Sequence, residues 1–290
     1  LKVSGNYIIS IFDTSGDIVF SRKFMVYEDI VTPGIAIKRS RDVSNIQTSQ
    51  TVDIEIESGS QINNPQQTIK TLIIQNSNLN TAISNLKPQY TIGNKLIYRY
   101  LKETTFPAGN EYLFFETKDL RAATSRVQSI ALEDIYLSFL YTDIARNNLP
   151  YTYNPDVNGQ FKIVAIDRDD VSTEADYVQV HFSLKHHELF NEEDIYIYGN
   201  YNNYALEDYN RLTFNPQNDL YETSMVLKQG FYNYKYVVVN KDNTLNEGAI
   251  TGNFWQTENN YKVLVYYRDL GARYDRIVGF NQVSSTNITN

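Results

Sequence analysis

Strict alternation of apolar and polar residues decides the fold, and it is clearest in the stretch Tyr177-Val178-Gln179-Val180-His181-Phe182-Ser183-Leu184. Side chains of a β-strand point alternately to opposite faces, so every second residue of this stretch shares a face. Val178 and Phe182 then point inward with their apolar neighbours, while His181 points outward. Residues 51–57 and 194–198 repeat the pattern, the second with two Tyr side chains on its outer face. Each stretch predicts a strand that packs one face against a core.

Short stretches rich in β-branched and aromatic residues continue along the whole chain, separated by turn residues. We predict further strands at residues 6–12, 18–26, 69–75, 95–101, 111–116, 127–132, 161–166, 220–227, 232–238, 261–267 and 275–280. No segment sustains the apolar spacing of an amphipathic helix, although residues 119–125 are compatible with one helical turn and 135–146 is ambiguous. We therefore predict an all-β protein with under about 10% helix, where roughly 30–35% is usual. Strands spaced in this way are typical of β-sandwich domains.

Two breaks in the strand pattern divide the chain. The first strand pair ends near residues 29–34, and a charged stretch at 167–174 ends a second block. The domains that we predict are a hairpin at 1–29, a central β-sandwich at 32–166, a C-terminal β-sandwich at 175–283 and a polar tail at 284–290. Two strands alone are marginally stable in water. We therefore interpret residues 1–29 as the last hairpin of a truncated N-terminal β-sandwich.

Composition excludes several classes of protein. The 290 residues carry a net charge of −8 and include no Cys and three His. A nucleic-acid-binding protein needs a basic face, which this charge argues against. The lack of Cys excludes disulfides, thiolate metal sites and Cys nucleophiles. No stretch approaches the roughly 20 consecutive apolar residues of a membrane span. The chain begins with Leu1 rather than Met and has no leader-like segment, so we expect it to lack the N-terminus of a longer protein.

Residues that commonly carry chemistry occur without the spacing that chemistry requires. His186 and His187 are neighbours in a predicted loop, with no acidic partner at metal-ligand spacing. The acidic clusters at 167–170 and 192–194 lack the glycine-punctuated loop of a calcium site, and we interpret them as linker and turn residues. The sequence contains no phosphate-binding glycine loop and no nucleophile elbow. We predict a protein that is not an enzyme, with no cofactor, no bound metal and no small-molecule substrate.

Aromatic residues in two loops are the remaining candidates for a binding site. One loop, residues 199–204, follows a predicted strand, and the other, residues 252–256, precedes one. Tyr and Trp are enriched at protein interfaces, and their flat rings can stack on sugars. The side chains that we predict to contact a partner are Tyr201, Asn203, Tyr204, Phe254 and Trp255. The alternative is that they cap the ends of the sandwich core, and we favour it for Trp255 because a large aromatic is usually buried.

Residues 195–239 resemble the starch- and glycogen-binding modules that are joined to carbohydrate enzymes and kinase regulators. The matching motifs are Ile197-Tyr198-Gly199-Asn200-Tyr201-Asn202-Asn203-Tyr204 and Leu227-Lys228-Gln229-Gly230-Phe231-Tyr232-Asn233-Tyr234-Lys235-Tyr236. The resemblance implies an early-set, immunoglobulin-like sandwich, so the fold class that we predict is a set of tandem immunoglobulin-like β-sandwich domains. It implies sugar binding only weakly, because Tyr204 stands where that family has its sugar-stacking Trp.

A second resemblance covers nearly the whole chain. The matching stretches include Phe106-Pro107-Ala108-Gly109-Asn110-Glu111 and Thr257-Glu258-Asn259-Asn260-Tyr261. Others, in the same order, are residues 4–7, 22–26, 61–65, 75–76, 82–83, 86–88, 175–178, 227–234, 266–268 and 273–276. In these stretches the chain is similar to the plug protein family of the type IX secretion system of Bacteroidota. It departs from that family at the N-terminus, where the family has a longer first domain.

The second resemblance implies a non-enzymatic periplasmic protein associated with the outer membrane. It would close the periplasmic end of the giant β-barrel translocon, which would be its partner. Two alternatives stay open at this stage. A carbohydrate-binding module protein of the cell envelope needs an open platform of aromatic rings, for which Tyr201, Tyr204 and Trp255 are the candidates. A hydrolase needs two acids that converge in a cleft, and the sequence nominates no such pair.

Overall fold

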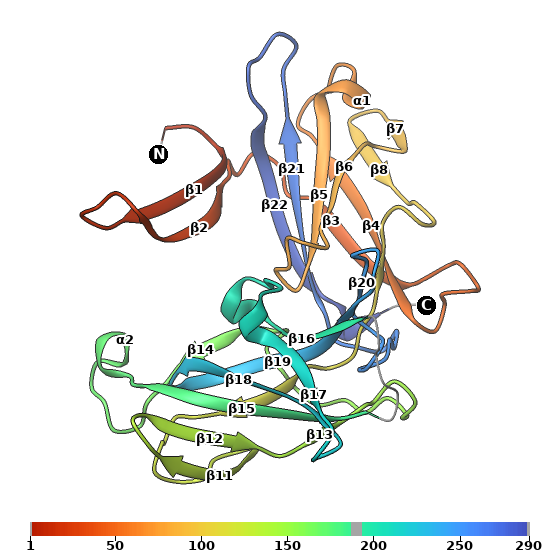
Figure 1. The fold of residues 1–290 in the computed structure, drawn as a ribbon. Coiled ribbons are helices and arrows are strands. Elements are labelled where there is room, and N and C mark those ends of the chain that lie inside the picture. The colour runs from red at the N-terminus through yellow and green to blue at the C-terminus, as the bar shows by residue number, and fades with distance from the viewer. Residues whose placement is uncertain (1, 187–192, 289–290) are drawn as a thin grey trace. The chain divides into compact units, whose positions relative to one another are not determined.

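The computed structural model describes residues 2–186 and 193–288. It is 6% helical and 47% strand, which confirms the prediction of an all-β protein built from several sheets. The chain divides into two compact units, shown in Figure 1. Unit 1 comprises Leu1–Ile46, Gln50–Phe106 and Asn259–Asn290, and unit 2 comprises Gln47–Ser49 and Pro107–Glu258.

Unit 1 contains a two-stranded hairpin and two larger sheets. The hairpin is β1 (Gly5–Phe12) and β2 (Ile18–Val26). One sheet has the order β22 (Arg276–Ser284), β21 (Asn260–Tyr267), β5 (Ile69–Gln75) and β6 (Ile83–Leu86). The other has the order β3 (Gly34–Arg39), β4 (Ser49–Glu57), β8 (Lys95–Tyr98) and β7 (Tyr90–Ile92), with β9 (Thr105–Pro107) also paired to β4. A short helix, α1 (Pro65–Thr68), precedes β5.

The core of unit 1 lies between its two larger sheets. The predicted alternation in β4 is present, because Val52, Ile54 and Ile56 are all buried. They belong to one apolar cluster with Ile73 of β5 and Val263 of β21. Burial of such side chains contributes about 25 cal/mol per Å² of apolar surface removed from water. This face-to-face contact defines a β-sandwich.

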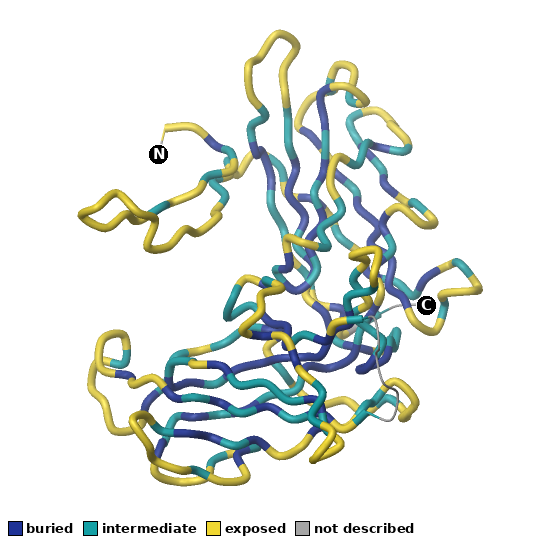
Figure 2. The backbone as a smooth tube through the Cα atoms, viewed as in Figure 1, coloured by how far each residue is buried: buried dark blue, intermediate teal, exposed yellow. Residues whose placement is uncertain are grey.

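The hairpin β1–β2 buries little of its own surface, as the mostly yellow trace in Figure 2 shows. The exposed fraction is 64% for Ile8 and 56% for Phe12 on one face, and 51% for Ile9 on the other face. Only its base is tied to the sheet of β21 and β22. There the hydroxyl of Ser4 donates a hydrogen bond to a carboxylate oxygen of Glu28, with 2.7 Å between the two oxygens. Glu28 also forms an ion pair with Arg276. The hairpin therefore presents apolar side chains on both of its faces.

Unit 2 is a second sandwich, formed by one sheet that folds back on itself. Its strand order is β10 (Leu113–Glu116), β19 (Gly230–Val239), β16 (Asp194–Tyr198), β17 (Arg211–Asn215), β18 (Leu220–Lys228), β15 (Tyr177–Lys185), β12 (Tyr136–Leu140) and β11 (Val127–Leu132). Three short strands pair off this path: β13 (Asp143–Ile144) with β15, and both β14 (Phe161–Ile163) and β20 (Leu245–Asn246) with β19. The helical turns are α2 (Val171–Glu174), η1 (Asn200–Asn202) and η2 (Asp208–Asn210), with η3 (Ser285–Asn287) in unit 1.

Residues 177–184 lie in β15, and their predicted alternation is confirmed. Val178, Val180, Phe182 and Leu184 are buried, while Gln179, His181 and Ser183 are only half-buried on the other face. The buried face of β15 packs against β19, where the ring centroid of Phe182 lies 5.3 Å from that of Tyr234. The two halves of the folded sheet therefore enclose one aromatic-rich core.

The two units do not follow the boundaries 32–166 and 175–283 that the sequence predicts. Strands β21 and β22 lie in the predicted C-terminal domain but complete the sandwich of unit 1, where Val263 pairs with Ile73. Strands β10 and β14 lie in the predicted central domain but pair with β19 in unit 2. The predicted boundaries followed breaks in local composition, whereas pairing between distant strands is decided by which buried faces match. The chain thus passes from unit 1 into unit 2 and back again.

Candidate functional site

The first predicted binding loop lies against the core of unit 2. Tyr204 is 1% exposed and packs on Tyr198, with ring centroids 5.0 Å apart. Tyr201 is half-buried against Tyr232, and its hydroxyl has no partner in the described part of the chain. Asn203 is exposed, and its left-handed backbone at φ 57° is one that Asn tolerates. This loop caps the core, so an open platform that includes Tyr204 does not form.

The second predicted loop packs against the segment that begins unit 2. Phe254 and Trp255 are half-buried. The backbone N–H of Phe254 donates to the carbonyl of Gly109 at 2.8 Å, and its ring centroid lies 5.7 Å from that of Tyr151. The backbone N–H of Trp255 donates to the carbonyl of Gln47 at 3.0 Å. The two predicted loops therefore contact different parts of unit 2, and both serve its packing.

Two acids with low exposure, Glu111 and Asp156, were not predicted from the sequence, and Glu111 is bonded to Glu258 just after the second loop. Glu111 is 1% exposed. One of its carboxylate oxygens accepts hydrogen bonds from the hydroxyl of Tyr151 at 2.5 Å and from the backbone N–H of Glu258 at 3.1 Å. Its other oxygen is buried and has no partner in the described ranges. Burial raises the pKa of Glu111 to about 7 and that of Asp156 to about 6. Glu111 can therefore exchange a proton near neutral pH.

A third acid is held by two tyrosines deeper in unit 2. Asp143 receives the hydroxyls of Tyr234 at 2.7 Å and Tyr236 at 2.8 Å, and its other oxygen receives a guanidinium N–H of Arg126 at 2.7 Å. Burial raises the pKa of Asp143, while the tyrosine hydroxyls and Arg126 oppose that rise. All polar contacts of this carboxylate are internal, so we interpret it as a structural group.

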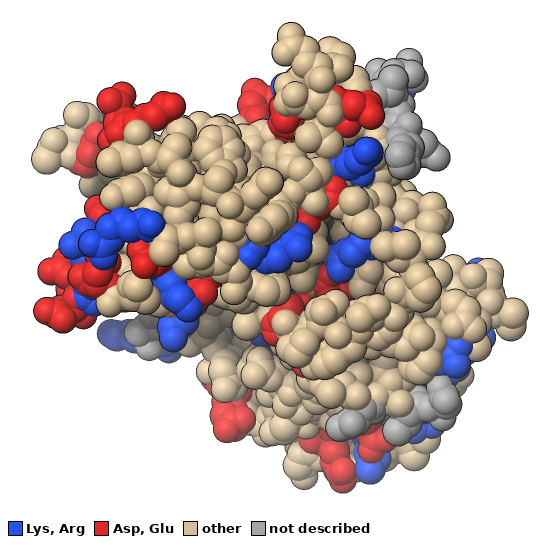
Figure 3. Space-filling view, turned by 90° about the horizontal axis from the view of Figure 1, so that it is seen from below, with Lys and Arg blue, Asp and Glu red and all other residues tan. Residues whose placement is uncertain are grey.

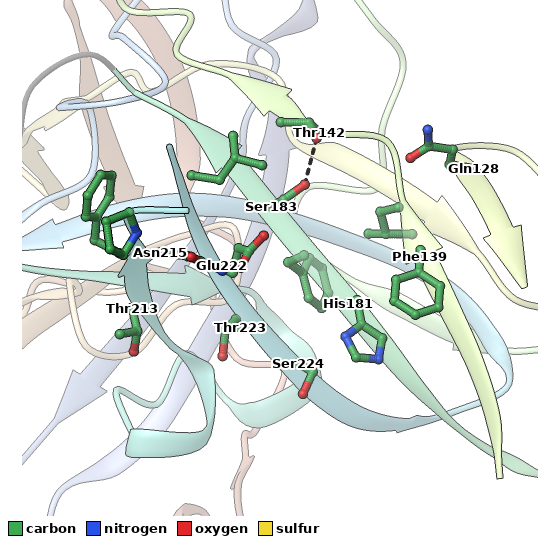
Figure 4. A pocket seen from close by; sticks show the side chains of 15 residues that line it. Gln128, Phe139, Thr142, His181, Ser183, Thr213, Asn215, Glu222, Thr223 and Ser224 are labelled. Carbon is green, nitrogen blue, oxygen red and sulfur yellow. Dashed lines mark hydrogen bonds between the residues drawn. The ribbon is translucent and has the colours of Figure 1, made fainter. Parts of the chain in front are cut away.

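Unit 2 has a groove of about 770 Å³ on the outer face of its folded sheet (Figure 4). Five neighbouring strands line it: β11, β12, β15, β18 and β17. The polar residues that line it are Gln128, Thr142, His181, Ser183, Thr213, Asn215, Glu222, Thr223 and Ser224. The apolar lining residues are Phe139, Leu140, Phe182, Phe214, Pro216 and Leu220. The groove has the size of a small-molecule site, for which about 300–1,000 Å³ is usual.

Two rings mark one side of the groove. His181 stacks on Phe139, with ring centroids 4.3 Å apart and planes 15° from parallel. Its Nε2 atom is shielded and finds no hydrogen-bond partner among the described residues. Burial lowers the pKa of His181, so the imidazole is neutral at pH 7. The outward position of His181 was predicted from the alternation of β15, but its pairing with Phe139 of β12 was not.

Charge is distributed in mixed groups. In Figure 3, uncharged residues cover most of the visible face, and blue and red atoms lie close together at several places on it. Two of the ion pairs are Arg168 with Asp176 at 3.0 Å and Arg121 with Asp167 at 3.3 Å. In residues 2–186 and 193–288, no group of three or more His, Asp or Glu gathers in a way that could hold a metal ion. His187 and Glu192, which belong to two of the predicted loop clusters, lie outside the described residues.

No helix in the described ranges is both long and apolar enough to cross a membrane.

The fold defines a class: an all-β protein with two sandwich units whose segments alternate along the chain. Comparison with known proteins found no matching family model and no matching curated protein. The chain is similar to a solved structure, that of a hypothetical protein from Parabacteroides merdae ATCC 43184. The two share 34% sequence identity with a TM-score of 0.92, over 98% of this chain and 72% of that one. This chain belongs to the same family as the Parabacteroides protein.

Proposed function

We propose that this protein is a non-enzymatic plug that closes the periplasmic end of the type IX secretion translocon in the outer membrane. The observation that carries the proposal is the ordered series of stretches, from residue 4 to residue 276, that resembles the plug family. A long series in one order is more specific than any single motif.

Two of the matching stretches are far apart in sequence and bonded to each other in the fold. The hydroxyl of Thr257 donates to the carbonyl of Gly109 at 2.8 Å, and the backbone N–H of Glu258 donates to the carboxylate of Glu111. Thr257, Asn110 and Glu111 are buried. These stretches therefore have a physical reason to occur together, since each completes the packing of the other. This supports a resemblance of whole folds rather than a chance match of surface motifs.

Gating by occlusion needs a body that deforms little and a contact that can be released. Close-packed sandwich cores meet the first need, because protein interiors are as dense as organic crystals. A transient contact is usually polar and hydrated rather than broadly apolar. Among the five predicted contact residues, Asn203 is exposed, while Phe254 and Trp255 are half-buried. Tyr204 is too deeply buried to touch a partner without rearrangement, so we omit it from the proposed contact surface.

The proposal is tested by affinity purification of the intact protein from cell envelopes under mild detergent. A very large outer-membrane β-barrel subunit should be recovered with it in comparable amount. Envelopes from cells that lack the translocon are the control for unspecific capture. Recovery of the protein without such a barrel, under conditions that preserve other outer-membrane complexes, would contradict the proposal.

The alternative of a carbohydrate-binding module loses the platform on which it depended. Tyr204 is buried, Tyr201 packs against the core and Trp255 lies in the other loop. These three rings therefore give no reason to prefer it over the plug.

A further inference from the structure

The groove on the outer face of unit 2 has a charge pattern that limits what it can bind. Among the described residues that line it, Glu222 is the one acid, and none is Lys or Arg. His181 is neutral at pH 7, because burial lowers its pKa. A phosphate or another anion would meet the carboxylate of Glu222 with no lining cation to compensate. The groove therefore suits a ligand without negative charge.

The hydrogen-bonding groups of the groove are only partly used within the protein. Glu222 accepts the side-chain amides of Asn215 at 2.8 Å and Asn218 at 2.9 Å. A carboxylate has about four acceptor positions, so it can also accept from a ligand. The hydroxyl of Ser224 accepts the amide of Gln179 at 2.9 Å and keeps its own proton to donate. These groups would be poorly matched by a wholly apolar ligand, because burying them without partners costs free energy.

Flat apolar surfaces flank the polar floor of the groove on both sides. On one side the rings of Phe139 and His181 stand side by side, as Figure 4 shows. On the other side lies Pro216, in the turn after β17, whereas the ring of Phe214 packs on the core residue Tyr221 with centroids 5.1 Å apart. A ligand that combines C–H faces with many hydroxyls would match both the walls and the floor. Oligosaccharides have this combination.

A peptide strand is a poorer match for the same surface. Extended peptides usually bind by adding to the free edge of a sheet, where backbone groups are unpaired. The two strands at the centre of the groove are paired on both sides, β15 with β12 and β18, and β18 with β15 and β17. Their backbone groups are therefore already used. We propose that the groove around His181 and Glu222 binds a neutral oligosaccharide.

This site is distinct from the platform of Tyr201, Tyr204 and Trp255, and it goes beyond the plug proposal. Either proposal can fail while the other holds, because one concerns a protein partner and the other a glycan. A plug with such a groove would bind neutral glycans of the cell envelope in addition to its contact with the translocon.

The test is titration of the full chain with three neutral probes, maltohexaose, cellohexaose and chitohexaose, monitored by calorimetry and by backbone NMR shifts. At least one probe should bind at millimolar concentration or below, with shifts confined to β11, β12, β15, β17 and β18. Glu222→Gln should weaken that binding about tenfold or more, because it replaces a charged acceptor by a neutral one. His181→Ala should weaken it about tenfold, because it removes a ring from the wall of the groove. Glu222→Gln nearly preserves the side-chain volume, so it tests the site even if His181→Ala does not fold.

Tyr177→Ala is the matched control. Tyr177 lies on the same strand and is 59% exposed, but it does not line the groove. This variant should bind the probe as the unchanged chain does. The proposal is overturned if none of the three probes binds, or if binding survives both groove substitutions. Preferential binding of an anionic glycan such as polygalacturonate, or of an extended peptide at the same residues, would also overturn it.

Discussion

The buried carboxyl of Glu111 should make unit 2 less stable as pH rises from about 4.5 to about 7. In the folded protein its pKa is raised from an ordinary 4.5 to about 7, chiefly by burial. The carboxyls of Asp156 and Glu258 raise it further, while the hydroxyl of Tyr151 and the backbone N–H of Glu258 oppose the rise. The guanidinium of Arg146 also lies on this segment, with a 2.7 Å bond to the carbonyl of Glu111.

The sign follows from comparing proton binding in the two states. Below pH 4.5 the carboxyl is protonated whether the chain is folded or unfolded, so it adds no pH dependence. Between pH 4.5 and 7 the unfolded chain loses its proton first, and the free energy of unfolding falls as pH rises. Above pH 7 both states are ionised and the full penalty is present. The pKa difference corresponds to about 3 kcal/mol.

The assay is urea unfolding of the wild-type chain and of Glu111→Gln at a series of pH values from 4.5 to 8.5. Trp255 is the single Trp and lies in the loop next to Glu111, so its fluorescence reports on this region. Wild type should lose stability with rising pH, and Glu111→Gln should remove about 3 kcal/mol of that loss. Asp143 and Asp156, whose pKa values are also raised, should leave a residual slope in the variant.

The exposed residue Asn203, which does not titrate, provides the control, because Asn203→Gly should keep the wild-type slope. Equal slopes for wild type and Glu111→Gln would refute the reasoning. So would a wild-type protein that is more stable at pH 8 than at pH 5.

Three further predictions test other parts of the fold. Asp143→Ala should lower the free energy of unfolding by about 3–5 kcal/mol, because it leaves two buried tyrosine hydroxyls and Arg126 without their acceptor; a loss under about 1 kcal/mol in urea unfolding would count against this. Tyr204→Ala should lower the free energy of unfolding by about 3–5 kcal/mol in the same assay, because it removes a buried aromatic ring. Asn203→Gly should lower it by about 0.5 kcal/mol or less, since Asn and Gly both tolerate the left-handed backbone at that position. Replacing Ile8 and Phe20 by Ser should reduce self-association of the 1–290 chain, measured by light scattering, because exposed apolar strands promote association. Unchanged scattering would show that the chain does not self-associate through the hairpin.

Local strand formation could be predicted from the sequence, but the partners of the strands could not. The alternation in β4, β15 and β16 requires only that one face be buried, and this is visible in the residues themselves. Pairing of β21 with β5 joins residues almost 200 positions apart, and nothing local in residues 260–267 distinguishes that partner from a nearer one. The predicted domain boundaries therefore followed gaps in composition instead of the sandwich cores.

The candidate sites show the same division. His181 was predicted on the outer face of its strand, but the groove also needs Phe139, Glu222 and Asn215 from three other strands. Tyr204 was predicted in a binding loop, yet the left-handed backbone at Asn203 and Tyr204 accompanies a ring that lies among core residues. Glu111 gave no signal as a single acid, because its burial depends on the distant loop at 252–258.

The central claim is that the protein closes a pore by occupying it. The most direct measurement is uptake of a large polar dye, normally excluded by the outer membrane, in cells that lack this protein and in cells that lack both it and the translocon. A wide β-barrel without its stopper is a water-filled channel. We expect the single deletion to leak, and we expect the additional loss of the translocon to abolish the leak. A single deletion that takes up no more dye than wild type, or a leak that persists without the translocon, would contradict it.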